Sequence, residues 1–507
     1  MDIRTRLSGW MALAVFATVG GAMVAADPAF AKVDVDKLTV SGEIRVRYEY
    51  RTQANFGTSA NSNESAGSHR VRIGVGYDLT PDVSFFAQVQ DARVWGSECV
   101  GAAGCATANT SGIGTVSSNN QNGSGVDLHQ GYIQVKNVLV PGLGLKLGRQ
   151  EIIYGDHRLF GNFGWSQVGN AFDAAKVMWT SEMVDVDLFW ARIIESEVAA
   201  GCAAGNANCS GVIFPVGQTK STTDQDIYGA YVTFKPAASW TIEPYYFLLK
   251  DSRPPGSTAL ITPQASSQAR NILGGRINGK AGGLDASLEA DMQFGSISSN
   301  TVGAPSDNLH INAHQEAAKL GYTFAAVPMK PRIGIEFNYA SGDDCVNKTG
   351  VNSCVSRGSF NTADNLYPTN HFHMGYMDLM AWKNMVNYAV MFDLKPSDVS
   401  KFQVNFIIHR LARTTDNWYR ASQGVYATSL ATNQEASLGQ ELDIHYWHTF
   451  KEKFKFEVGY GHFFTGAYIE KSAAQVASGA STGPASTATF TNTSDQNWGY
   501  VMASVLF

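Results

Sequence analysis

Apolar and polar residues alternate at every second position over many stretches of this chain. Residues 43–50, 70–79, 332–339, 402–406 and 441–446 show the pattern with few interruptions. Successive side chains of a β-strand point to opposite faces of the sheet, so this period predicts strands with one apolar and one polar face. Eighteen candidate strands start near residues 38, 68, 83, 126, 143, 171, 184, 224, 240, 268, 283, 310, 331, 381, 399, 438, 454 and 495.

The lengths of these strands and of their connections favour a membrane barrel over a soluble sandwich. Most candidate strands have about ten to thirteen residues, whereas soluble strands average about five or six and membrane-crossing strands need about nine to eleven. Short and long connections alternate, as in outer-membrane barrels with short periplasmic turns and long extracellular loops. We therefore predict an all-β, transmembrane antiparallel barrel of about 18 strands, with 16–20 possible. The short connections are residues 80–82, 140–142, 180–182, 236–239, 281–282, 327–329, 396–398 and 451–453.

Composition agrees with a barrel in which half of each strand meets lipid. Only 16% of the 507 residues are charged, against about 25% in average proteins. After the N-terminus no apolar run approaches the roughly 18 residues of a spanning helix. The 38 Lys and Arg residues face 44 Asp and Glu residues, a net charge of -6, which argues against a nucleic-acid partner.

The N-terminus has the features of an export signal. Arg4 and Arg6 precede an apolar stretch over residues 10–24, and Ala29-Phe30-Ala31 provides a small-residue cleavage site. We predict a cleaved signal peptide over residues 1–31 and a single barrel domain over residues 32–507, in the outer membrane of a Gram-negative bacterium. The final strand ends at Phe507, which is typical of substrates of the barrel-assembly machinery.

Six cysteines form three close pairs in segments rich in Gly, Ser and Asn: Cys99/Cys105, Cys202/Cys209 and Cys345/Cys354. All three pairs fall in the long connections. Local pairs in an exported protein predict loop-closing disulfides. Metal binding is the alternative, but the spacings exceed C-x2-C and no ordered His partners recur. We expect no metal site and no cofactor.

Four segments resemble the alginate export family of outer-membrane proteins. They are residues 147–159, running on to Gly164-Trp165 and Phe172-Asp173; residues 366–378, followed by Trp382-Lys383-Asn384; residues 438–443; and residues 459–464. Their order and spacing fit the family over most of the chain from about residue 38. The resemblance implies an eighteen-stranded channel that exports an anionic polysaccharide, with a periplasmic polysaccharide-export complex as a possible partner. Outer-membrane lipid and lipopolysaccharide would surround it.

Strand parity supplies candidate residues for the lumen wall, and the Gly-Arg-Gln step of the family resemblance adds Arg149. A pore for uronate polymers needs cations on this wall, because rings of Arg or Lys select anions. Two interpretations stay open: these charges form ion pairs that stiffen the wall, or they contact the cargo directly. Acidic residues share the same faces and predict a mixed lumen. The candidates are Arg45, Arg47, Arg70, Arg72, Arg149, Glu151, Arg332, Glu336, Glu441 and Asp443.

The longest connection, residues 342–380, contains apolar residues where a polar loop is expected. We hypothesise that it folds into the barrel and narrows it. The constriction candidates are Tyr367, His371, Phe372, His373, Tyr376 and Asp378. The sequence contains no G-x-S-x-G, H-E-x-x-H or phosphate-binding motif, so we predict no enzymatic activity.

The prediction is an outer-membrane channel that passes a hydrophilic solute or polysaccharide, with anionic cargo as one option, by passive diffusion or export. A general diffusion porin is the alternative within transport. A structural or adhesive surface barrel with a blocked pore is the alternative from another class.

Overall fold

The computed structural model describes residues 34–52, 56, 63–95, 126–194, 224–252, 267–298, 308–344, 359–427, 429, 432–477 and 493–507. Residues Thr39–Phe507 form one compact unit and Met1–Leu38 another. The predicted signal peptide lies outside the described residues, so its cleavage stays a prediction. In the N-terminal unit, the described part is a single 3-10 turn, η3 (Val35–Lys37), capped by the Asp34 side chain.

The three predicted disulfides have no support in the structure. All six cysteines lie outside the described residues, and the described part of the chain contains neither a cysteine nor a disulfide bond. Loop closure by disulfides therefore stays a prediction from the sequence alone, and nothing below depends on it. The predicted partners are Cys99 with Cys105, Cys202 with Cys209, and Cys345 with Cys354.

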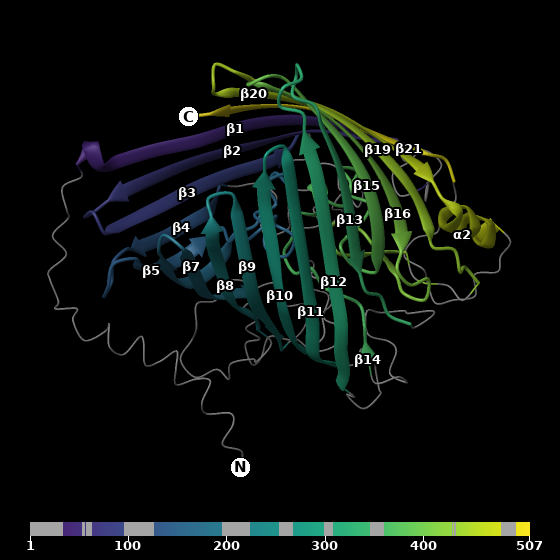
Figure 1. Cartoon of the computed structure of the whole chain (residues 1–507), viewed down its shortest axis with the longest axis horizontal. Coiled ribbons are helices and arrows are strands. Elements are labelled where there is room, and N and C mark those ends of the chain that lie inside the picture. Colours follow the sequence, from purple (N-terminus) through teal and green to yellow (C-terminus); the bar gives the residue numbers. More distant parts are fainter. Residues whose placement is uncertain are drawn as a thin grey trace, which may run out of the picture. The chain divides into compact units, whose positions relative to one another are not determined.

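Eighteen strands of the larger unit form a closed antiparallel barrel (Figure 1). Sequential strands pair with each other around the wall. The first and last strands then pair in a register that runs from Glu43 opposite Leu506 to Arg51 opposite Trp498. This closure leaves no open sheet edge, which a sheet in lipid requires because no water is present to satisfy backbone groups. The strands are β1 (Leu38–Arg51), β2 (Glu64–Asp78), β3 (Val83–Val94), β4 (Asp127–Val135), β5 (Leu143–Gln150), β6 (Phe172–Thr180), β7 (Val184–Ile194), β8 (Gln225–Ala237), β9 (Trp240–Asp251), β10 (Gln268–Ala281), β11 (Leu284–Ser298), β12 (Asn308–Thr323), β13 (Arg332–Ala340), β15 (Met385–Ser397), β16 (Ser400–Leu411), β19 (Ser437–Phe450), β20 (Phe454–Thr465) and β21 (Gln496–Leu506).

The predicted fold class and strand count are confirmed. Every predicted start lies within four residues of an observed one. The largest differences are β2, which starts at Glu64 instead of 68, and β15, which starts at Met385 instead of 381. At β15 the cause is local: Trp382, Lys383 and Asn384 are all buried, whereas consecutive residues of a wall strand alternate between the buried inner face and the exposed outer face.

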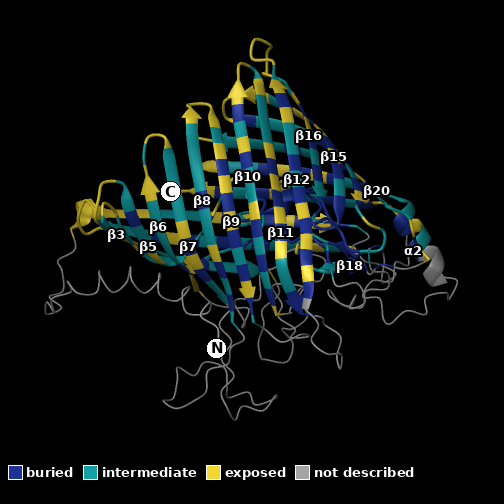
Figure 2. Cartoon of the chain, turned by 60° about the horizontal axis from the view of Figure 1, so that its bottom comes forward, coloured by how far each residue is buried: buried dark blue, intermediate teal, exposed yellow. Residues whose placement is uncertain are grey.

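The two faces of each strand differ in the way that the alternation predicts, as the banded colouring in Figure 2 shows. On β1, Ile44, Val46, Tyr48 and Tyr50 are 37–51% exposed on the outer face. The alternating residues Arg45, Arg47, Glu49 and Arg51 are at most 5% exposed on the inner face. Lipid covers the apolar outer face in an outer-membrane barrel. The apolar and aromatic side chains that are exposed on β1 are therefore the side chains expected to contact lipid.

The buried core of this protein lies inside the barrel, where three long connections pack against apolar side chains on the inner face of the wall. The three connections are the described parts of residues 151–171, 341–384 and 412–436. Phe160, Trp382 and Tyr419, one from each connection, are 0% exposed. A bridge between Phe160 and Tyr367 joins the first two connections.

The long connections contain short helices and strands. They are β14 (Ser359–Phe360), which pairs parallel to β12, the η7 turn (Asn370–Phe372), the hairpin of β17 (Trp418–Tyr419) with β18 (Val425–Ala427), and α2 (Ala467–Ala477). Among the described residues, no helix has the length and apolar character needed to cross a membrane.

Candidate functional site: the lumen of the barrel

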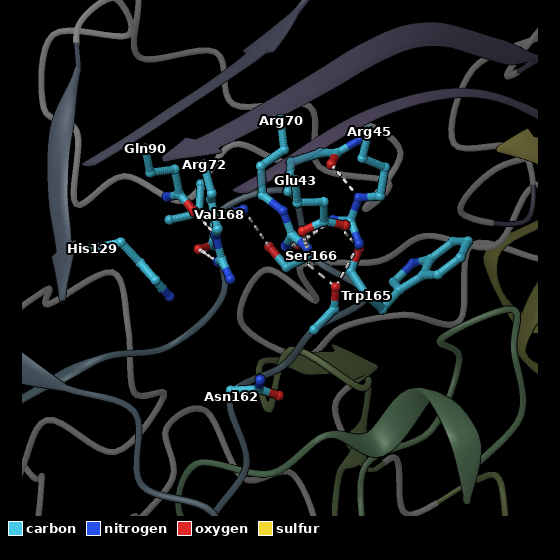
Figure 3. Close-up of polar contacts among 12 residues, drawn as sticks. Glu43, Arg45, Arg70, Arg72, Gln90, His129, Asn162, Trp165, Ser166 and Val168 are labelled. Atoms are coloured by element: carbon cyan, nitrogen blue, oxygen red, sulfur yellow. Dashed lines mark hydrogen bonds and ion pairs between the residues drawn. The ribbon is translucent and has the colours of Figure 1, made fainter. Parts of the chain in front are cut away.

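Arginines on β1 and β2 hold the first interior connection through its backbone carbonyl groups (Figure 3). Arg45 donates to the carbonyl oxygens of Gly164 at 2.7 Å and Ser166 at 2.7 Å. Arg47 donates to the carbonyl of Trp165 at 2.6 Å, and its guanidinium lies 3.9 Å from the Trp165 ring centroid. A planar guanidinium with five donors suits this role. The segment 164–168 is therefore fastened to the wall by charge-assisted hydrogen bonds.

Arg70 and Arg72 extend this arrangement along β2. Arg70 donates to Ser166 O at 2.9 Å and pairs with Glu43 at 2.5 Å. Arg72 donates to Val168 O at 2.8 Å and lies 3.4 Å from Glu151. All four predicted arginines of β1 and β2 face inward, and all four are buried under the loop. Each of the four arginines donates at least one hydrogen bond to a backbone carbonyl of residues 164–168.

Two carboxylates on β19 hold the second interior connection through its backbone N–H groups. Met377 N donates to Glu441 Oε1 at 2.8 Å, and Tyr376 N donates to Asp443 Oδ2 at 3.4 Å. Gly375 has φ +95, and a Cβ there would lie 2.6 Å from Glu441 Oε1. Glycine is required both for this left-handed backbone and for the close approach of the carboxylate. Glu441 and Asp443 thus face inward as predicted, and both are 0% exposed.

The two interior connections pack against each other through aromatic rings. The His371 ring stacks on Trp165 at 4.1 Å with an interplanar angle of 14°. His371 Nδ1 lies 3.0 Å from Asp378 Oδ1, which orients the ring. Tyr376 contacts His445 of the wall at 3.8 Å between ring centroids. His371 and Tyr376 are therefore structural contacts between the connections and the wall.

Ion pairs fasten the opposite side of the same connections. Arg158 pairs with Glu336 at 2.6 Å and donates to Asn338 Oδ1 at 2.8 Å. The ring of His373 lies between two acceptors, with Nε2 2.8 Å from Asp156 O and Nδ1 3.6 Å from Glu336. Burial lowers the pKa of His373, and the charge of Arg158 lowers it further. The nearby Glu336 carboxylate raises this pKa, but the net direction is downward, which favours the neutral ring with Nε2–H donating to the Asp156 carbonyl.

Asp156 anchors the same segment to β10. Arg276 pairs with Asp156 at 2.6 Å and with Glu243 at 2.9 Å. Burial opposes ionisation of Asp156, but Arg276 and neighbouring cations keep its pKa below the usual range. The carboxylate stays charged, so this anchor holds at neutral pH.

The remaining predicted residues have separate environments. Arg332 faces inward near the short turns and pairs with Asp285 at 2.7 Å and Asp393 at 3.1 Å. Tyr367 is buried at the bridge between connections, where its hydroxyl donates to Gln225. Phe372 is 49% exposed, so its ring is not part of the packed core.

The inward placement of Arg149 is wrong. Gln150 on β5 is 0% exposed and faces inward, whereas Leu147 is 38% exposed on the outer face. Arg149 shares the parity of Leu147 and pairs with Asp173, whose side chain is 64% exposed, at 3.1 Å. The inward placement of Arg149 rested on the Gly-Arg-Gln step of the family resemblance. Glu151 does reach the lumen: β5 ends at Gln150, and Glu151, the first residue of the connection, binds His129 at 2.8 Å.

Between the interior connections and the short turns, the inner wall from β5 to β20 keeps part of its surface open. Basic side chains outnumber acidic ones among the inner-face residues that are at least partly exposed here. We call this set the vestibule. Its acidic members are Asp185, Asp187 and Asp285, and its basic members are Lys146, Lys176, Lys235, Lys280, Lys319, Arg332, Lys401 and Lys455.

The family model described as "Alginate export" matches residues 36–481. The chain belongs to the alginate export family. No curated protein matches the chain. Solved structures agree on the fold: Acinetobacter baumannii OccAB4 is 9% identical, with a TM-score of 0.52 over 94% of this chain and 100% of that one. Pseudomonas aeruginosa OccK8 (OprE) is 12% identical, with a TM-score of 0.51 over 93% and 98%. Family and fold together assign the protein as an outer-membrane channel.

The four segments that resemble the alginate export family meet in space. Glu441 of the third segment binds Met377 of the second. Trp165, at the end of the first, stacks on His371 of the second. Gly461 of the fourth leaves room for Met377, since a Cβ there would lie 2.8 Å from its Cγ. The family pattern in this chain therefore coincides with the contacts between interior connections and wall.

Sequence reasoning identified one interior connection and missed two. Residues 359–384 fold into the barrel as hypothesised for this loop; residues 345–358 lie outside the described part. Residues 151–171 and the β17–β18 hairpin do the same. Leu159, Phe160 and Trp165 are apolar residues in a predicted loop, the same signal that marked Tyr367 and Tyr376, and Trp418-Tyr419 is another such pair. No group of three or more His, Cys, Asp or Glu side chains in the described ranges is placed to hold a metal ion.

Proposed function

We propose that this channel passes an anionic polysaccharide of the uronate class across the outer membrane by passive diffusion. The observation that carries the proposal is the excess of open basic side chains in the vestibule. Membership of the alginate export family supports the same class of cargo. Cations on a low-dielectric wall concentrate anionic solutes at the channel entrance.

The burial of most inner-face carboxylates reconciles this proposal with the net charge of -6. Glu49, Glu336, Glu441 and Asp443 are each at most 5% exposed. They bind side chains or backbone groups of the protein itself and present little charge to a solute. Among inner-face residues of the vestibule that stay partly open, cations outnumber carboxylates. Six of these cations also lie within ion-pair distance of an Asp or Glu: Lys176, Lys235, Lys319, Arg332, Lys401 and Lys455.

Ion selectivity tests the proposal. The full-length protein is inserted into planar bilayers under a KCl gradient, and the reversal potential is measured before and after uronate oligomers are added on the side of the short turns. We expect a preference for chloride over potassium and a current block by the oligomers. A neutral oligosaccharide of the same length is the control. Cation preference, or equal block by both sugars, would favour a general diffusion porin instead.

A structural or adhesive barrel is the second candidate, because packed side chains of three connections occupy the interior. Phe160, Trp382 and Tyr419 are fully buried there. The same recordings separate the two functions. An inserted, folded barrel that gives no measurable conductance would support the adhesive role and contradict the channel.

A further inference from the structure

Lys146 and Lys176 lie directly opposite each other on the inner face of neighbouring strands. They are register partners in the pairing of β5 with β6. Both side chains point inward, since Leu147, next to Lys146, is 38% exposed on the outer face. Like charges directly opposite in a sheet are destabilising. The wall therefore contains a pair of like charges that does not contribute to its stability.

The Asp187 carboxylate is bound by Lys176 and by Tyr154, but it forms no ion pair with Lys146. Lys176 Nζ lies 2.9 Å from Asp187 Oδ2, and the Tyr154 hydroxyl donates to the same oxygen at 3.0 Å. Lys146 Nζ lies 3.8 Å from the ring centroid of Tyr132. Within the part of the chain that the structure describes, no carboxylate lies within ion-pair distance of Lys146 Nζ. The pair thus retains an uncompensated positive charge.

The surroundings of this charge suit a sugar acid. Tyr132 and Phe86 present neighbouring rings, 5.5 Å apart, on the inner face of β4 and β3. Gln134 is the register partner of Lys146 on the other side. All four of these side chains, Lys146 included, are half-buried. Rings that contact the apolar face of a pyranose, amides that bind hydroxyls and an ammonium that binds a carboxylate are the groups that a uronate residue requires.

We infer that Lys146 and Lys176, with Tyr132 and Gln134, form a binding subsite for the carboxylate of one uronate residue in transit. The inference rests on the proposed function and gives it a location. An anion between the two ammonium groups would remove their repulsion, and Lys146 would exchange part of its contact with Tyr132 for the carboxylate. The site lies beside residues 151–171, because Tyr154 of that connection shares Asp187.

The arginines of β1 and β2 cannot serve in this way in the same conformation. Arg45, Arg47, Arg70 and Arg72 are each at most 7% exposed and donate to the carbonyls of residues 164–168. Lys146, by contrast, is half-buried, and among the described residues no carboxylate lies within ion-pair distance of its ammonium group.

Block by uronate oligomers in planar bilayers tests the subsite. Trimers are added on the side of the short turns to the full-length wild type, to Lys146→Gln and to the double variant Lys146→Gln/Lys176→Gln. We expect Lys146→Gln to weaken the blocking Kd roughly tenfold, which corresponds to about 1.4 kcal/mol. Lys146→Arg should restore block. Lys250→Gln is the matched control, since Lys250 is an exposed lysine on the outer face of β9, between the buried residues Leu249 and Asp251.

Stability provides a second readout that does not depend on the cargo. Removing one member of a repulsive pair should leave the Tm of Lys146→Gln unchanged or higher, whereas a lysine needed for the wall would lower it. Equal weakening of block by Lys250→Gln, no weakening by Lys146→Gln, or a lower Tm would overturn the subsite and leave the channel proposal standing. Absence of any block of the wild type would overturn both.

Discussion

Two stretches of the inner wall carry basic residues on the same face but differ in what covers them. On β1 and β2, arginines lie under residues 164–168 and are nearly inaccessible. On β5 and β6, Lys146 and Lys176 remain half-buried, and one carboxylate lies within reach of Lys176 alone. The comparison shows that a charged side chain on the lumen face binds a connection to the wall when that connection packs over it. Where none does, the charge stays available to a solute.

The largest effect should come from removing arginines of the covered stretch. Arg45→Met combined with Arg70→Met leaves the carbonyls of Gly164 and Ser166 without their donors. A buried acceptor left unsatisfied costs about 1–3 kcal/mol, so the segment should leave the wall. We expect a lower Tm and a higher single-channel conductance in planar bilayers. Unchanged conductance with a lower Tm would show that residues 164–168 do not narrow the pore.

A backbone change on the opposite wall should act nearly as strongly. Gly375→Ala places a Cβ 2.6 Å from Glu441 at φ +95. The left-handed backbone alone costs about 1–2 kcal/mol for a residue with a Cβ, and the clash adds to it. The contact of Met377 with Glu441 should break, which raises current noise and lowers the Tm. Gly424→Ala, at a glycine where the nearest atom is 3.5 Å away, is the control.

Acidification should loosen the interior connections by a smaller amount. The pKa of His373 is lowered in the docked state by burial and by Arg158, whereas an unconstrained His titrates near about 6.5. The undocked state therefore binds more protons, and docking weakens as the pH falls below about 6.5. Conductance fluctuations should increase as the pH is lowered through this range. His373→Asn keeps an N–H donor for Asp156 O, and the pH response should shrink in this variant; an unaltered response would place the titration elsewhere.

The smallest effect should come from the arginine that the barrel places outside. Arg149→Gln removes a pair with Asp173 on the outer face, where the Asp173 side chain is 64% exposed. Exposed pairs contribute about 0–1 kcal/mol. Conductance and ion selectivity should equal those of the wild type, measured in the same bilayers as the Arg45 variant. A change in selectivity would show that Arg149 reaches the lumen after all.

Strand positions were predictable because the signal for them is local. Alternate residues of each strand face two different environments, and their residue types differ accordingly. On β1, Ile44 and Val46 face outward while Arg45 and Arg47 face inward. The prediction failed at Arg149, which was placed inward on the family resemblance. Arg149 lies within β5, next to the buried, inward-facing Gln150. Alternation along the strand places it on the outer face.

The sequence did not predict which inward-facing charges bind an interior connection and which stay open. Arg45 and Gly164 are joined by a hydrogen bond but are separated by 119 residues, and Arg158 and Glu336 by 178. Nothing in the strand pattern indicates which connection covers which stretch of wall.

The sequence by itself determined the barrel, its strand count, the side that meets lipid and the family. Alternation, strand length and turn length are properties of neighbouring residues, and lipid imposes them on every strand. Only the tertiary structure decided which charges are used within the protein and which stay open. That outcome depends on the long-range packing of the interior connections. A covered arginine and a half-buried lysine have the same charge, but the arginine binds the protein's own backbone and the lysine stays open to a solute.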